Sequence, residues 1–181
     1  MSELPPLSAF GARIMVCGPS NSGKSTLAVA LGQKLGLETF HLDLFRHLPD
    51  TDWVQRPDAE FLAMHDEAIT HDRWVMEGNY SKFFPQRIAR ATGIILLGDN
   101  RWANFARYIR RTLFQKRQRP GSLAGDKDSL KWDMVYWILV TSPRNLETYR
   151  RTLPQAGPPF LERRGMGELN ALYEAWNLTR D

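Results

Sequence analysis

Eight consecutive residues near the start of the chain have the types and spacing of a phosphate-binding loop. The segment Gly18–Ser25 satisfies the pattern G-x-x-x-x-G-K-[ST]. Glycines allow the backbone to turn so that successive N–H groups and a helix N-terminus face phosphate oxygens. In such loops the lysine, here Lys24, reaches the β- and γ-phosphates, and the next hydroxyl, here Ser25, binds Mg²⁺. The loop therefore predicts a site for the phosphates of a Mg-bound nucleoside triphosphate.

The surroundings of this loop also fit a nucleotide site. An apolar run precedes it at 13–17 and a segment of helical period follows it, as the motif requires. No guanine-reading Asn-Lys-x-Asp pattern follows the apolar run at 93–97, which disfavours a GTPase and is consistent with ATP and Mg²⁺ as the ligands. The residues expected to bind the nucleotide are the glycines and polar side chains of the loop: Gly18, Ser20, Asn21, Ser22, Gly23, Lys24, Ser25 and Thr26.

Two carboxylates follow other apolar runs. Asp43 comes directly after His41 and Leu42, and Glu77 ends the run that begins at Trp74. Ligands of open α/β folds bind at the carboxyl ends of strands, so both are expected there. Asp43 is predicted to orient or deprotonate an acceptor hydroxyl, and Glu77 to hold Mg²⁺ directly or through water. A helix N-cap or loop carboxylate for Asp43, and a solvated strand-end glutamate for Glu77, are the alternatives.

A basic segment without acidic residues lies between Asn100 and Pro120. Positive charge there suits a phosphoryl-transfer enzyme whose lid closes over phosphates. A nucleic-acid-binding stripe and a merely solvated cationic helix stay open as alternatives. Apolar residues recur at helical spacing in the same segment and are expected to face the core: Trp102, Phe105, Ile109 and Leu113.

Five short apolar runs alternate with longer segments of helical period. This alternation predicts an α/β fold with three layers, in which helices cover both faces of a parallel sheet. The predicted strands are Arg13–Cys17, Thr39–Leu42, Trp74–Glu77, Gly93–Leu97 and Phe160–Glu162. The predicted helices are Gly23–Leu35, Pro57–Thr70, Ser81–Ala91, Trp102–Arg117, Leu130–Val140, Asn145–Leu153 and Glu168–Trp176. Gln118–Lys127, with its glycines and proline, is the best candidate for a mobile loop.

The 181 residues fit a single domain with a core of its own. A net charge of +4 favours an anionic partner. The single cysteine, Cys17, lies in an apolar run, so no internal disulfide is possible and a reducing compartment is expected. Without a signal-like N-terminus or a membrane-length apolar run, the protein is expected to be soluble and cytoplasmic. The histidines lack metal-ligand spacing and are predicted to be structural or surface residues.

Taken together, these motifs resemble those of the adenylate-kinase-like P-loop kinases, and specifically the DNA topology modulation (FlaR-related) proteins. The resemblance covers most of the chain. It rests on the phosphate loop Gly18–Thr26, on Leu-Gly-x-x-Leu-Gly at 31–36, on His-Leu-Asp at 41–43 and on Trp-Val-Met-Glu-Gly-Asn-Tyr at 74–80. Arg101, Trp102, Arg107 and Arg111 are similar to the start of the family's lid.

The resemblance implies a P-loop NTPase fold whose five parallel strands have the order 2-3-1-4-5, with an ATP site at the loop and an acceptor site facing Asp43. It implies one domain over 1–181, with the nucleotide and acceptor core at 12–100, an arginine-rich lid at about 101–130, and C-terminal helices with the last strand at 131–181. Lys24, Asp43, Arg107 and Arg111 would be the catalytic residues, and Ser25 and Glu77 the metal ligands.

Three departures from the family pattern bear on these roles. Glu77 stands where the family usually has aspartate, and in Leu97–Arg101 the acid, Asp99, is shifted by one position and the proline is absent. Within the wider adenylate-kinase-like set, an arginine that grips the acceptor phosphate follows the third strand closely, whereas here the next arginine is Arg87, a full turn or more later. This spacing keeps a small hydroxylated acceptor open beside a nucleotide.

The sequence therefore leaves two alternative functions open. The first is a kinase that transfers the γ-phosphoryl group of Mg·ATP to a nucleotide or small hydroxylated metabolite, with that acceptor as its partner. The alternative is an ATP-dependent regulatory or DNA-associated protein with weak ATPase activity. Binding to a nucleic-acid backbone should weaken steeply as salt rises, whereas binding of a small acceptor in a pocket should not.

Overall fold

The computed structural model describes residues 4–51, 53–114 and 131–180. The predicted loop Gln118–Lys127 and much of the predicted lid at 101–130 lie outside the described residues. Within the described part, no helix combines the length and apolar character needed to cross a bilayer.

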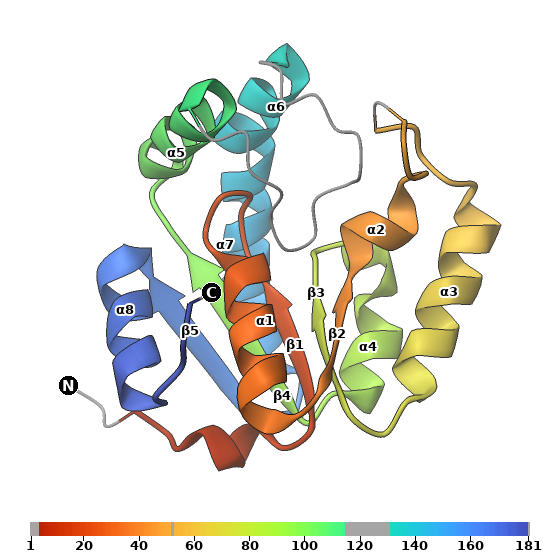
Figure 1. Ribbon diagram of the computed structural model, residues 1–181, viewed down its shortest axis with the longest axis vertical. Helices are drawn as coiled ribbons and strands as arrows, with labels where there is room; N and C mark the ends of the chain where they lie inside the picture. Colours follow the sequence, from red (N-terminus) through yellow and green to blue (C-terminus); the bar gives the residue numbers. More distant parts are fainter. Residues whose placement is uncertain (1–3, 52, 115–130, 181) are drawn as a thin grey trace.

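A parallel sheet of five strands in the order β2-β3-β1-β4-β5 forms the centre of the protein (Figure 1), and the predicted fold class is confirmed. The first and third strands have the predicted bounds, whereas β2 starts and ends one residue earlier and β4 and β5 continue further. The strands are β1 (Arg13–Cys17), β2 (Glu38–His41), β3 (Trp74–Glu77), β4 (Gly93–Gly98) and β5 (Phe160–Arg164).

Helices cover both faces of this sheet, because alternate residues of each central strand point to opposite sides. The helices are α1 (Lys24–Leu35), α2 (Leu42–Arg46), α3 (Asp58–Thr70), α4 (Phe84–Arg90), α5 (Arg101–Phe114), α6 (Trp132–Tyr136), α7 (Ser142–Thr152) and α8 (Gly165–Ala175). Ile14 and Val16 of β1 pack with α1 and α8, whereas Met15 and Cys17 pack with α3, α4 and α7.

Short helical turns complete the described chain. The 3₁₀ turns are Leu7–Phe10, Ser81–Phe83 and Leu153–Gln155, and a π-helical turn, Trp137–Thr141, follows α6. Helix α2 was not predicted, because five residues are too few to show a helical period. Its presence moves Asp43 from the end of a strand into the first turn of a helix.

Helix α5 corrects the prediction for the basic segment. Trp102 and Leu113, predicted to face the core, are 59% and 53% exposed, whereas Asn104 and Tyr108 are buried. The reason is that α5 lies beyond the carboxyl end of the sheet, where it contacts the π-helical turn after α6 (Figure 1). Its apolar residues therefore have no sheet face against which to pack.

Candidate active site

The phosphate loop connects β1 to α1 at the carboxyl edge of the sheet. Gly18, Asn21 and Gly23 have φ angles of +141°, +63° and +92°. Left-handed residues alternating with ordinary ones turn successive N–H groups towards one side, which is the geometry of an anion-binding concavity. At Gly18 a Cβ atom would lie 2.1 Å from the carbonyl oxygen of Leu97, so no larger residue fits.

Gly18→Ala is expected to lower the free energy of unfolding by about 2 to 4 kcal/mol, because it combines an unfavourable φ with a backbone clash. Gly157→Ala is the matched control, since Gly157 also has a positive φ, of +104°, but no heavy atom lies within 4 Å of its added Cβ. The control should lose only about 1 to 2 kcal/mol. Urea denaturation measures both, and equal losses would show that the contact with Leu97 is unimportant.

Several polar groups of the loop are suited to bind phosphate oxygens. Lys24 Nζ donates to the carbonyl oxygen of Pro19 at 3.0 Å, which keeps the ammonium group against the loop. Asn21 Nδ2 and Ser22 Oγ are buried without a hydrogen-bond partner among the described residues. Buried donors without partners are costly unless a ligand satisfies them, which suits a loop that binds oxyanions. Ser20 lies in the loop itself, and Thr26 in the first turn of α1.

A hydroxyl and a carboxylate meet beside this loop. Ser25 Oγ donates to Glu77 Oε1 at 2.9 Å, and His41 Nδ1 lies 3.0 Å from the same oxygen. Burial by itself would raise the pKa of Glu77, but the His41 hydrogen bond and the charge of Lys24 outweigh it and lower that pKa. Glu77 therefore stays ionised at neutral pH.

The pair formed by Ser25 and Glu77 fits Mg²⁺ better than a transition metal. Among the described residues there is no cluster of three or more His, Cys, Asp or Glu side chains that could hold an ion alone. Mg²⁺ needs no such cluster, because it keeps several waters and binds one or two protein oxygens together with substrate phosphates.

A second carboxylate lies close to the first. Asp43 Oδ1 accepts a hydrogen bond from the Tyr80 hydroxyl at 2.6 Å. Burial, followed by the negative charge of Glu77, raises the pKa of Asp43, although Tyr80 and Lys24 act in the opposite direction. A carboxylate with a raised pKa is a better proton acceptor than an ordinary aspartate, so Asp43 is suited to act as a general base.

The sequence motifs contained three further residues of this site whose contacts were not predicted. His41 was predicted to be a structural or surface residue; it is buried, and its ring faces Glu77, with which it is in register across β2 and β3. Asn79 Oδ1 accepts from the backbone N–H of Gly18 at 3.0 Å, and Tyr80 donates to Asp43. The pairing of strands was the available signal for His41, whereas the contacts of Asn79 and Tyr80 depend on the turn after β3.

The two arginines of α5 that were predicted to be catalytic, Arg107 and Arg111, contact the phosphate loop. Arg107 Nε donates to the Asn21 carbonyl oxygen at 2.8 Å, and Arg111 donates to Asn21 Oδ1. Arg107 also donates to Asn104 Oδ1 at 2.6 Å and forms an ion pair with Asp99. Asp99, to which the sequence assigned no role, therefore holds one of these arginines.

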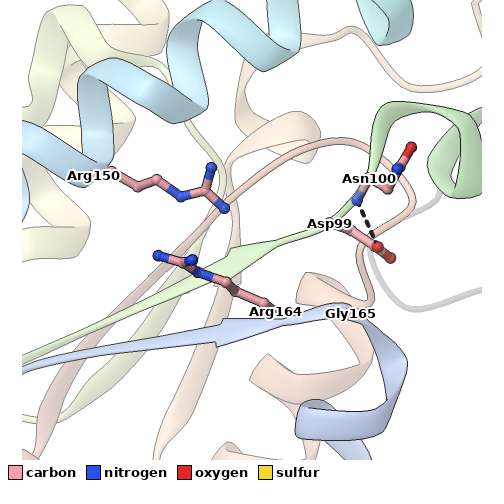
Figure 2. A pocket seen from close by; sticks show the side chains of 5 residues that line it. All are labelled: Asp99, Asn100, Arg150, Arg164 and Gly165. Carbon is pink, nitrogen blue, oxygen red and sulfur yellow. Dashed lines mark hydrogen bonds between the residues drawn. The ribbon is translucent and has the colours of Figure 1, made fainter.

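A pocket of about 390 Å³ opens where β4 and β5 end, lined by Asp99, Asn100, Arg150, Arg164 and Gly165 (Figure 2). Glu162 accepts from Arg150 at 2.6 Å and from Arg164 at 3.0 Å, so both cations share one carboxylate. Asp99 also binds Arg107, which contacts the phosphate loop, so the pocket adjoins that loop. A ligand whose phosphates bind the loop could therefore extend towards the pocket.

Comparison with known proteins shows the fold of the chain. No family model and no curated protein matches it. A candidate kinase from Chloroflexus aurantiacus J-10-fl superposes with a TM-score of 0.55 at 19% identity, over 90% of this chain and 95% of that one. The two proteins share a fold. A sugar kinase from Janibacter sp. HTCC2649, solved without ligand, superposes with a TM-score of 0.49 at 14% identity, over 92% and 94%.

Proposed function

We propose that this protein is a kinase that transfers the γ-phosphoryl group of Mg·ATP to a hydroxyl group of a nucleotide or small metabolite. The observation that carries the proposal is the meeting of two half-sites at one edge of the sheet. A phosphate loop with its Ser25–Glu77 pair lies close enough to the Asp43–Tyr80 pair for the charges of Glu77 and Lys24 to act on Asp43. The fold shared with a candidate kinase supports the proposal.

The donor half binds and orients ATP. The loop N–H groups and Lys24 would hold the β- and γ-phosphates, and Ser25 and Glu77 would hold Mg²⁺. The ion, when bound, neutralises charge on the phosphate oxygens. Glu77 stays ionised through its contact with His41 and so keeps a charged ligand available at neutral pH.

The acceptor half supplies a base at a fixed position. Asp43 would accept a hydrogen bond from the acceptor hydroxyl and take its proton as that oxygen bonds to the γ-phosphorus. The bond from this phosphorus to the bridging oxygen of the β-phosphate breaks at the same time, and ADP leaves. The Tyr80 hydroxyl binds one carboxylate oxygen, Oδ1, and thereby orients the group.

Arg107 and Arg111 would stabilise the charge of the transferring phosphoryl group. Their contacts with Asn21 hold both guanidinium groups beside the loop.

Arg107→Lys and Arg111→Lys are each expected to lower turnover by about 10²- to 10³-fold, because lysine cannot reproduce the planar fork of donors. Arg110→Lys, an exposed position on the same helix, is the control and should change turnover less than about twofold. Steady-state ADP release measures all three, and equal effects at 107, 110 and 111 would remove the specific role of the two loop-contacting arginines.

The proposal is tested by measuring ADP release from Mg·ATP in a continuous coupled assay. Nucleoside monophosphates, nucleosides, small hydroxy acids and sugars, and duplex DNA are added in turn. Strong stimulation by one small acceptor supports the kinase and identifies the acceptor class. Stimulation by DNA alone, weakening steeply with salt, would replace it with the DNA-associated alternative.

A further inference from the structure

Arg87 of α4 has an unusual position for an arginine, a residue type that is almost never fully buried without a partner. Its relative exposure is 0%, and its guanidinium lies 4.9 Å from the ring centroid of Phe84. Nη1 donates to the Gly78 carbonyl oxygen at 2.8 Å, and Nη2 donates to that of Tyr80 at 3.0 Å and also to that of Asn79. The side chain thus binds three successive carbonyl groups.

Such a burial is costly. Burial lowers the pKa of Arg87 to about 10, so the side chain is still cationic at neutral pH. A buried charge is tolerated when hydrogen bonds or an opposite charge compensate it. The hydrogen-bond partners shown among the described residues are carbonyl oxygens, and Nε has no partner there. The guanidinium supplies donors to main-chain carbonyl groups that an apolar side chain could not supply, which points to a role beyond packing.

The turn that Arg87 binds has a strained backbone. Gly78 and Tyr80 have φ angles of +128° and +39°, and the second value is unfavourable for a side chain as bulky as tyrosine. At Gly78 a Cβ atom would lie 2.9 Å from Leu42 Cβ, so the turn passes close to the start of α2. Three carbonyl groups directed at one guanidinium hold a conformation that the local sequence would not adopt alone.

This conformation places two side chains in the candidate active site. Asn79 Oδ1 accepts from the N–H of Gly18 at 3.0 Å, at the start of the phosphate loop. Tyr80 donates to Asp43 at 2.6 Å, in the acceptor half. The residues bound by Arg87 through their main chains are therefore the ones that contact both half-sites through their side chains.

We propose that Arg87 is a positioning residue, which fixes the turn Gly78–Tyr80 so that Asn79 holds the phosphate loop and Tyr80 holds Asp43. The catalytic part of this inference rests on the proposed kinase function. It also bears on acceptor recognition, because a guanidinium with no exposed surface cannot bind a phosphate group of the acceptor. An acceptor phosphate would need another cation.

The first test does not depend on activity. In Arg87→Lys, hydrogen exchange of the Gly18 amide, measured by NMR, is expected to be at least about tenfold faster, because the Asn79 contact loosens. Asn79→Ala removes that contact directly and should produce the same change. Arg90→Lys is the matched control, since Arg90 of the same helix also binds two carbonyl groups, those of Ile69 and Thr70, but faces away from the site. Unchanged Gly18 exchange in a folded Arg87→Lys variant would overturn the proposal.

If Arg87→Lys does not fold, Arg87→Met is measured in the same way, because buried ionic groups can often be replaced by apolar ones without loss of stability. A folded Arg87→Met variant with faster Gly18 exchange supports the proposal. If the Gly18 amide of that variant exchanges at the wild-type rate, Arg87 only fills space and the proposal is wrong.

The second test uses a double-mutant cycle on acceptor-stimulated turnover. Arg87→Lys and Tyr80→Phe are each expected to lower turnover by about 10- to 100-fold, and the double variant should lose little more than the worse single variant. Losses that multiply would show that Arg87 does not act through Tyr80. If no acceptor stimulates turnover at all, the kinase function fails, whereas the exchange measurement still decides whether Arg87 positions the phosphate loop.

Discussion

Replacement of Lys24 by alanine is expected to abolish tight binding of Mg·ATP, with the dissociation constant raised by at least about a hundredfold. The ammonium group lies against the loop, 3.0 Å from the Pro19 carbonyl oxygen, at the N-terminus of α1. There it can form charge-assisted hydrogen bonds to two phosphates, and each such bond contributes about 1.5 to 3 kcal/mol. Isothermal titration calorimetry of both proteins with Mg·ATP measures the loss.

Lys34→Ala is the matched control for this variant. Lys34 lies in the last turn of the same helix and is exposed, at the end remote from the loop. Its removal changes net charge and helix composition equally but should leave the affinity for Mg·ATP within about twofold. Unchanged affinity in Lys24→Ala would contradict the assignment of the loop as the ATP site, and the kinase proposal would then fail with it.

Asp43→Asn is expected to lower acceptor-stimulated turnover by about 10³-fold while the affinity for Mg·ATP changes less than about threefold. Asparagine keeps the oxygen that accepts from Tyr80 but cannot take a proton from the acceptor. Asp72→Asn, at an exposed site on the loop before β3, is the control. A variant that retains turnover would show that Asp43 is a structural carboxylate.

The pH dependence of turnover is a second test of the role of Asp43 as a general base. The base must be ionised, and its pKa is raised above the usual range by burial and by Glu77. Wild-type turnover should therefore fall as pH decreases through this raised pKa, which lies above that of an ordinary aspartate. The residual activity of Asp43→Asn should lack that decrease. If the variant shows the same decrease in turnover at low pH, a group other than Asp43 causes it.

The stability of this variant should change in the opposite direction to its activity. A folded-state pKa above the unfolded value means that the native protein binds the proton more tightly, so stability falls as pH rises from the unfolded value through the folded one. At neutral pH wild type carries this cost, whereas the neutral amide does not. Asp43→Asn should therefore unfold at a temperature no lower than wild type, which differential scanning calorimetry at pH 7 would measure.

Local patterns in the sequence predicted much of the fold. The apolar run Arg13–Cys17 and the glycine-rich loop after it define β1 and the start of α1, because both depend on residues close together in the chain. The strand order came from a resemblance rather than from periodicity, and the sheet has that order. The proximity of Ser25 and Glu77 could also be predicted from local patterns, because parallel strands bring their carboxyl ends to one edge of the sheet.

Other features of the site were decided by tertiary packing. The apolar spacing on α5 predicted a buried face, but the helix lies beyond the sheet, so Trp102 is exposed while Arg107 contacts the loop. No local pattern distinguishes Arg87 from a solvated arginine, because its burial depends on how α4 packs over the turn after β3.

The amino-acid sequence by itself therefore determined the sheet-forming segments, the phosphate loop and the kinds of side chain at the strand ends. Only the tertiary structure decided which of these side chains touch. Contacts such as Tyr80 with Asp43, 37 residues apart, and Arg107 with Asn21, 86 residues apart, join segments whose distance is set by the packing of the sheet and helices. Periodicity indicates which face of an element can be buried, but not whether that face finds a partner or which partner it meets across the fold.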